Sequence, residues 1–351
     1  MDNKKYTAFV GTYTKAHSKG IYKFTLDENK PEIQNIECVA ELGSPTYLTI
    51  FQNSEYLYSV IKDATSGGIA SYKIDKLNTE LKFLNSKLIS GKPPCHVILN
   101  PENNYVFSGN YHKAELIAYP IDHRGSLKDP SDKILHRESG PNKSRQESAH
   151  IHFVNFTPDN KFLYTIDLGI DMLSLYKVVS GKFIEEPDKN LQLKPGCGPR
   201  HMDFHPKGNF AYIIAELTSE IITLAYNSSL GTFKDIQYIS TLPSNCSVES
   251  TGGAVHISED GRFLYASNRG HDSITVFKID QLSGKLEFVL NTKLKGKTPR
   301  DFSLSPSSNF LVAANQSTNN IELYSIDRET GILKFLNISE YIPTPVCIKF
   351  L

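Results

Sequence analysis

Short apolar segments alternate with polar turns along the whole chain, and one pattern recurs. An aromatic residue, any residue, an aliphatic residue and an aspartate stand together at residues 24–27, 72–75, 119–122, 277–280 and 324–327, with degraded copies at 176–179 and 224–227. The first positions of these seven copies lie 48, 47, 57, 48, 53 and 47 residues apart. A repeat of about fifty residues therefore fills the chain.

A second marker precedes every copy except the first. It is an aromatic residue that opens a short apolar segment, at Tyr56, Tyr105, Phe162, Phe210, Phe263 and Phe310. Eleven residues before it another segment begins, in four units with a proline: Pro45, Pro94, Pro199 and Pro299. Segments such as residues 162–166 show no helical stripe, so each unit is predicted to hold four short strands.

Seven units of four strands predict an all-β protein, a seven-bladed β-propeller in which each blade covers the apolar face of its neighbour. Six or eight blades are the alternatives. The tail, residues 345–351, is a proline-led strand, and residues 6–10 match the second strand of a unit. We therefore expect strands from both termini to close the last blade, with residues 1–351 forming a single domain.

Composition narrows the class of protein. The 38 Lys and Arg balance 38 Asp and Glu, which argues against a protein held to nucleic acid or to a membrane by bulk charge. The five cysteines are scattered without a C-x-x-C pair, as is typical of reduced thiols, and no apolar run approaches the ~20 residues of a membrane span. We expect a cytoplasmic protein with no nucleic-acid or membrane partner.

Propeller topology predicts where chemistry gathers. The first strand of a blade starts, and the second ends, on the same face near the axis. The residues expected at this mouth are His96, His152, Arg200, His201, Glu216, Arg269, His271 and Arg300. The repeated aspartates Asp27, Asp75, Asp122, Asp280 and Asp327 are expected to be structural, because a site does not need five copies.

Three arginines at one mouth favour a small anionic ligand, because guanidinium groups bind carboxylate or phosphate with two parallel hydrogen bonds. Two long connections, residues 123–149 and 242–253, are expected to rise on this face as a rim or lid. His136 and Arg145 within the first of them are expected to be solvated.

Signals for a cofactor are weak. Residues 196–199 form only half of a dinucleotide fingerprint, and no P-loop or nucleophile elbow is present. His150 and His152 resemble a metal pair without a clear third ligand. A ring of Asn110, Asp167, Glu216, Asn268 and Asn315 keeps a metal as the minor alternative. We expect no metal and no cofactor.

The chain resembles the lactonase family of seven-bladed propellers, typified by propeller-type 6-phosphogluconolactonases and fungal carboxymuconate cyclases. The resemblance covers the whole chain and rests on motifs that are specific in combination: residues 10–14 and 20–22, 94–97, 150–152, 198–201 with 204–206, 215–217, 267–274, 299–302 and 345–350. It implies hydrolysis of 6-phosphogluconolactone in the pentose phosphate pathway without a required metal. The His, two Arg and Glu of the cyclase site fall on His152, Arg200, Arg269 and Glu216.

Lactone opening needs a base for the attacking water and positive charge where the oxyanion develops. We expect His152 or Glu216 to be the base, with Arg200 and Arg269 holding the anionic group and the oxyanion. Arg300, His201, His271 and His96 are expected to bind substrate at the mouth. The alternatives are a muconate cyclase, a metal-dependent lactonase and a propeller that only binds other proteins.

Overall fold

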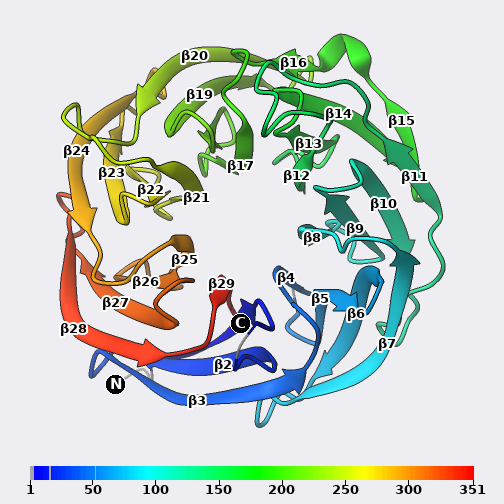
Figure 1. Ribbon diagram of the computed structural model, residues 1–351, viewed down its shortest axis with the longest axis horizontal. Helices are drawn as coiled ribbons and strands as arrows, with labels where there is room; N and C mark the ends of the chain where they lie inside the picture. The colour runs from blue at the N-terminus through cyan, green and yellow to red at the C-terminus, as the bar shows by residue number, and fades with distance from the viewer. Residues whose placement is uncertain (1–3, 16, 52) are drawn as a thin grey trace.

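The computed structural model describes residues 4–15, 17–51 and 53–351, and it arranges them in seven sheets around one axis. Figure 1 shows the ring, with the first strand of each sheet at the centre and the last at the rim. Blade 1 has the strand order β29 (Pro345–Phe350), β1 (Lys5–Thr12), β2 (Gly20–Asp27) and β3 (Glu32–Glu41). Strands from both ends of the chain thus close this blade, as the repeat predicted.

Five further blades follow the same antiparallel order from the axis outwards. They are blade 2, β4 (Leu48–Ile50), β5 (Tyr56–Asp63), β6 (Ser66–Ile74) and β7 (Leu81–Ser90); blade 3, β8 (His96–Leu99), β9 (Tyr105–Asn110), β10 (Glu115–Pro120) and β11 (Asp132–Leu135); blade 5, β17 (Pro199–Phe204), β18 (Phe210–Ala215), β19 (Glu220–Asn227) and β20 (Thr232–Ser240); blade 6, β21 (Thr251–Ile257), β22 (Phe263–Arg269), β23 (Ser273–Ile279) and β24 (Leu286–Lys293); and blade 7, β25 (Pro299–Leu304), β26 (Phe310–Asn315), β27 (Asn320–Ile326) and β28 (Leu333–Tyr341).

Blade 4 departs from the four-strand expectation at its outer edge. It contains β12 (Ile151–Phe156), β13 (Leu163–Asp167), β14 (Met172–Val179) and β15 (Lys182–Glu185), and a short fifth strand, β16 (Leu191–Gln192), also pairs with β14. A 3₁₀ turn, Pro187–Lys189, separates β15 from β16. Proline has no N–H for the ladder, so the outer strand is split into two pieces here.

The aromatic residue that marks the second strand contacts the outer turn of the next blade. In five of the seven blades a glycine in the outer turn adopts positive φ and lies against the aromatic residue at the start of the second strand of the preceding blade, so that at Gly284 a Cβ atom would lie only 2.4 Å from the ring of Phe210. The pairs are Tyr56 with Gly125, Tyr105 with Gly181, Phe162 with Gly231, Phe210 with Gly284, and Phe263 with Gly331.

The repeated aspartates are structural, as expected. Each accepts a hydrogen bond from the backbone N–H two residues later, which fixes the outer turn. The bonds run from Asn29 to Asp27, Leu77 to Asp75, Arg124 to Asp122, Leu282 to Asp280 and Glu329 to Asp327. Within the part of the chain that is described, no helix is long and apolar enough to cross a bilayer.

Candidate active site

A β-bulge in the inner strands aims side chains at the propeller axis. In β12, β17 and β25 the pairing with the next strand skips one residue, which is His152, Arg200 or Arg300 respectively. A bulged residue has no partner in the ladder, and the local kink re-aims its side chain. His152 and Arg200 are 5% and 2% exposed, whereas Arg300 is half-buried. The bulges therefore bring three of the predicted residues to one mouth of the channel.

The residues that leave the second strands supply the other half of the site. Tyr111, Glu216 and Arg269 occupy equivalent positions in blades 3, 5 and 6, and all three line one cavity. The equivalence follows from the register pairs that precede them: Asn110 with Glu115, Ala215 with Glu220 and Asn268 with Ser273.

The same register rules out the ring of amides and carboxylates that was the minor alternative for a metal site. Glu216 lies one position beyond Asn110, Asp167, Asn268 and Asn315, whose equivalent in blade 5 is Ala215. The side chains of Asn110 and Asp167 instead accept hydrogen bonds from the backbone N–H groups of His112 and Gly169, at 3.0 and 2.9 Å. These residues fix the turns after the second strands.

His150 does not join His152 as a ligand pair. Its ring stacks on Tyr111 with centroids 4.1 Å apart, and its Nδ1 donates to the carbonyl oxygen of Tyr111 at 2.8 Å. Among the residues that the structure describes, no group of three or more His, Cys, Asp or Glu side chains is placed to hold a metal ion. The cavity chemistry must therefore be read from its arginines, Glu216 and His152.

Glu216 is the centre of an arginine cluster. Its Oε2 lies 2.7 Å from Nη2 of Arg269 and 3.1 Å from Nε of Arg200, and its Oε1 pairs with Arg145. Burial alone would raise the pKa of this carboxyl, but the charges of Arg269 and Arg200 outweigh burial and hold the pKa well below its usual range. Glu216 is thus a permanent anion that positions three guanidinium groups.

Arg200 lies deepest in the cluster. Its Nη1 donates to the carbonyl oxygen of Gly253 at 2.7 Å. Burial, followed by the charges of Arg269 and Arg300, lowers its pKa to about 9, so it remains charged at neutral pH. The arginines around Glu216 outnumber the carboxylate three to one. This excess of positive charge favours an anion or a developing oxyanion in the cavity.

His152 is a buried, uncharged imidazole in the site. Burial, and after it the charge of Arg200, holds the pKa of His152 well below its ordinary value. Its Nδ1 is buried and has no hydrogen-bond partner among the described residues. An uncharged imidazole beside three arginines can accept a proton from water, whereas the lone pairs of Glu216 are already engaged.

The side chain of His136 is buried, contrary to the expectation that it is solvated, and Arg145 is partly exposed but pairs with Glu216. His136 places Nδ1 2.6 Å from Oδ2 of Asp167 and Nε2 2.6 Å from the hydroxyl of Tyr176, and its side chain is 7% exposed. Gln146 is fully buried and donates from Nε2 to the carbonyl oxygen of Leu168 at 2.9 Å. These anchors hold the connection over blade 4, so that Arg145 reaches Glu216 from the rim.

The cavity lined by His152, Glu216, Arg145 and Arg269 has a volume of about 490 Å³, and Arg200 is buried behind Glu216, outside the lining. Its charged lining consists of six cationic side chains and one carboxylate: Lys15, Lys62, Lys92, Arg145, Arg269, Arg300 and Glu216. We call it the arginine cavity. A volume of this size suits a small molecule, and the charge balance selects an anionic one.

Comparison with known proteins decides the family. A family model described as "Lactonase, 7-bladed beta-propeller" matches residues 7–350. The chain belongs to the lactonase family of seven-bladed propellers. A 6-phosphogluconolactonase of Bacillus subtilis (strain 168) is 44% identical over 347 residues, which cover 99% of each chain. The arginine cavity of the present chain is therefore the candidate active site of a lactonase.

Solved structures agree along the whole length. A protein from Lactobacillus plantarum superposes with a TM-score of 0.94 at 36% identity, covering 99% of both chains. A periplasmic gluconolactonase of Pseudomonas aeruginosa superposes with a TM-score of 0.93 at 28% identity, again covering 99% of both chains. The propeller and its closure are thus shared with experimentally determined structures.

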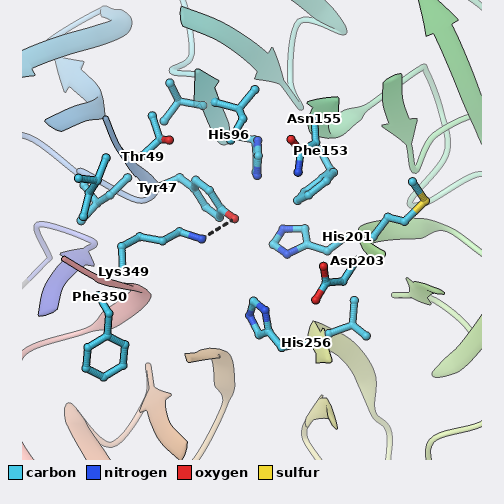
Figure 2. A pocket seen from close by; sticks show the side chains of 16 residues that line it. Tyr47, Thr49, His96, Phe153, Asn155, His201, Asp203, His256, Lys349 and Phe350 are labelled. Atoms are coloured by element: carbon cyan, nitrogen blue, oxygen red, sulfur yellow. Dashed lines mark hydrogen bonds between the residues drawn. The ribbon is translucent and has the colours of Figure 1, made fainter. Parts of the chain in front are cut away.

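His96 and His201 do not line the arginine cavity of this lactonase. With Tyr47 and Phe153 they form a layer of rings across the middle of the channel, where the centroids of Tyr47 and His96 lie 4.0 Å apart and those of Phe153 and His201 5.1 Å apart. Figure 2 shows these rings facing a second cavity of about 350 Å³, at the far ends of the inner strands, together with Lys349. Phe153 and His201 each follow the bulged residue of their strand, and their side chains line the second cavity instead of the arginine cavity.

His271 also lies outside the arginine cavity. Gly270 adopts a φ of 102° directly after β22, and this turn carries the chain away from the axis. The His271 ring is 2.8 Å from the hydroxyl of Ser273, and its carbonyl oxygen accepts a hydrogen bond from Lys293 at 2.6 Å. The expectation that His271 lines the mouth is wrong, because the sequence does not show the direction of this turn.

Proposed function

We propose that this protein hydrolyses 6-phosphogluconolactone to 6-phosphogluconate, a step of the pentose phosphate pathway, in the cytoplasm. The observation that carries the proposal is the arginine cavity, in which a neutral histidine lies beside an arginine-clamped carboxylate within an excess of positive charge. The Bacillus subtilis relative, which is named 6-phosphogluconolactonase and aligns over nearly the whole chain, supports this substrate. The five free cysteines agree with a reducing compartment.

His152 acts as the general base in this proposal. Water attacks the lactone carbonyl carbon and transfers a proton to His152, while negative charge develops on the carbonyl oxygen. Arg200 and Arg269, oriented by Glu216, stabilise that oxyanion. The bond from the carbonyl carbon to the ring oxygen then breaks, and the proton on His152 passes to the leaving oxygen. The products are a hydroxyl group and a carboxylic acid, which releases its proton to solvent and becomes a carboxylate, with one water consumed.

Glu216 is a poorer candidate for the base. A carboxylate paired with Arg145, Arg200 and Arg269 has a strongly lowered pKa and therefore a weak affinity for a proton. We assign it the role of a positioning residue for the two arginines. The cationic lining would also repel a divalent metal ion, so the proposal includes activity that does not depend on a metal.

The test measures the initial rate of lactone hydrolysis with freshly prepared 6-phosphogluconolactone, with and without a chelator. The lactonase step is quenched at short times, and the 6-phosphogluconate formed is then measured with 6-phosphogluconate dehydrogenase, which is supplied with its own metal. A rate well above spontaneous hydrolysis that the chelator leaves unchanged supports the proposal. Turnover of a muconolactone with none of the phosphorylated lactone would contradict it in favour of a cyclase. Loss of activity on chelation would contradict the metal-free mechanism.

A further inference from the structure

Two cations flank a single aromatic ring at the edge of the arginine cavity. Lys15 Nζ lies 5.3 Å from the ring centroid of Tyr13, and the guanidinium carbon of Arg300 lies 5.6 Å from the same centroid. Tyr13, Lys15 and Arg300 all line the cavity. We call these three residues the Tyr13 corner. Both cations thus lie beside the same ring, where no attraction between them offsets the repulsion of their like charges.

No carboxylate offsets these charges within residues 4–15, 17–51 and 53–351. Neither Lys15 nor Arg300 makes an ion pair or a side-chain hydrogen bond with a described residue. The acidic neighbour of Arg300 in the chain, Asp301, turns down the channel and accepts a hydrogen bond from Ile348 N–H at 3.0 Å. The Tyr13 corner is therefore an unneutralised cationic site that faces a cavity.

The Glu216 cluster differs in this respect. There Arg145, Arg200 and Arg269 share a carboxylate, which would repel the two negative charges of a phosphate group. The Tyr13 corner comes from blades 1 and 7, whereas the Glu216 carboxylate follows β18 in blade 5. The cavity thus contains the Glu216 cluster, which has a fixed carboxylate, and cations without one: Lys62, Lys92 and the Tyr13 corner, where two cations share one ring.

We propose that the Tyr13 corner is the phosphate subsite, and that Arg300 and Lys15 select phosphorylated lactones over neutral aldonolactones. This inference rests on the proposed function. In a 6-phospho-δ-lactone the phosphate is several bonds away from the reacting carbonyl, so the two groups need separate partners. The carbonyl lies between His152 and the Glu216 cluster, and the phosphate oxygens accept hydrogen bonds from Arg300 and Lys15.

The proposal is tested by comparing kcat/KM for 6-phosphogluconolactone and for unphosphorylated glucono-δ-lactone. Arg300→Gln should lower the value for the phosphorylated substrate about tenfold or more, the usual cost of a lost charge-assisted hydrogen bond. The value for the unphosphorylated lactone should change by less than about twofold. Lys15→Met should act in the same direction, and Arg300→Lys should recover part of the loss. An equal fall on both substrates overturns the proposal.

Lys19→Met is the matched control, because it removes one positive charge from the same segment. Lys19 pairs with Glu41 at 3.6 Å, is 67% exposed in its side chain and lies outside the cavity lining. The ratio of kcat/KM for the phosphorylated lactone to kcat/KM for the unphosphorylated lactone should be the same in Lys19→Met as in the wild type. Thermal unfolding of every variant separates a lost contact from a lost fold.

A titration with inorganic phosphate tests the subsite without turnover. The wild-type protein should bind phosphate, and Arg300→Gln should weaken that binding about tenfold or more. If the wild type hydrolyses neither lactone, the proposed function fails and this titration alone decides the subsite. Equal phosphate binding by the wild type and Arg300→Gln overturns the subsite even when the lactonase assay succeeds.

Discussion

Glu216 and Arg269 occupy the same position of two neighbouring blades, and Oε2 of Glu216 lies 2.7 Å from Nη2 of Arg269. The equivalent position holds Tyr111 in blade 3, Leu168 in blade 4 and Gln316 in blade 7. In blades 5 and 6 it holds two residues of opposite charge. Because Glu216 is buried and Arg269 is half-buried, the pair fixes the direction of the Arg269 guanidinium. We propose that this geometry stabilises the oxyanion.

Replacing Glu216 by glutamine should therefore disable the site. Three arginines would lose their shared anion, so we expect kcat/KM to fall by about 10²–10³, the size of a lost oxyanion contact. Breaking the buried pairs should also lower the free energy of unfolding by about 3 kcal/mol. Initial rates and urea denaturation measure the two effects. Glu220→Gln, four residues on and paired with the partly exposed Lys194 at 3.7 Å, is the control.

Wild-type kcat/KM for Glu216→Gln would contradict this role. A loss of stability without a loss of activity would make Glu216 a purely structural residue.

The pH dependence should report His152. Its pKa is held well below the ordinary imidazole value, first by burial and then by Arg200, so the neutral base is already present at low pH. Activity should be complete above this lowered pKa and be lost as the pH falls through it. We therefore expect kcat/KM to stay constant as the pH decreases past about 6.5.

Two substrates are needed for this measurement because the phosphate group of the natural lactone itself titrates near pH ~6. The profile with glucono-δ-lactone reports the protein alone. Phosphate bound at the Tyr13 corner offsets the charge of Arg300, which helps to lower the pKa of His152, so the midpoint in kcat should lie above that in kcat/KM for the phosphorylated lactone. A midpoint at or above about 6.5 with the unphosphorylated lactone would contradict the assignment.

The anchor of the rim connection should affect substrate binding. His136→Phe removes the hydrogen bonds to Asp167 and Tyr176, and we expect it to lower the free energy of unfolding by about 2 kcal/mol. It should also raise KM, because Arg145 is carried on the same connection. Arg137→Ala changes the exposed neighbour and should leave both quantities unchanged. An unaltered KM in His136→Phe would show that Arg145 is positioned independently of this anchor.

Closure of the ring should depend on the last strand. β29 pairs with β1 through Cys347 and Ile348, which are buried almost completely. Removing residues 345–351 exposes an inner strand edge and the faces of two blades, so we expect the sharp urea transition to be lost. A synthetic peptide of these residues should restore it in trans. A shortened chain with the stability of the full chain would contradict closure by both termini.

The blade architecture could be predicted because each repeated residue makes the same contact in several blades. Phe210 and Gly284, for example, are far apart in sequence but make one contact that four other pairs repeat. Residues of the site follow no such rule. Arg200 and Arg300 could be predicted because both follow the proline that opens the inner strand of a blade. The bulge that directs their side chains occurs at the same position in both blades.

Arg145 and Tyr13 were missed for a physical reason. Arg145 lies in the longest connection, where no repeat register applies, and its position is set by the burial of His136 and Gln146. Tyr13 contributes a ring between two cations, a contact that depends on loops from blades 1 and 7 meeting in space. His271 was misplaced because a single positive φ at Gly270 turns the chain.

The most direct test of the central claim is the hydrolysis of 6-phosphogluconolactone by His152→Gln, which keeps the size and polarity of the side chain but removes the base. We predict a fall in kcat of about 10²–10⁴, the range for loss of a general base, with intact folding by circular dichroism. His123→Gln, in an exposed turn, should retain full activity. Wild-type kcat in His152→Gln would contradict the account.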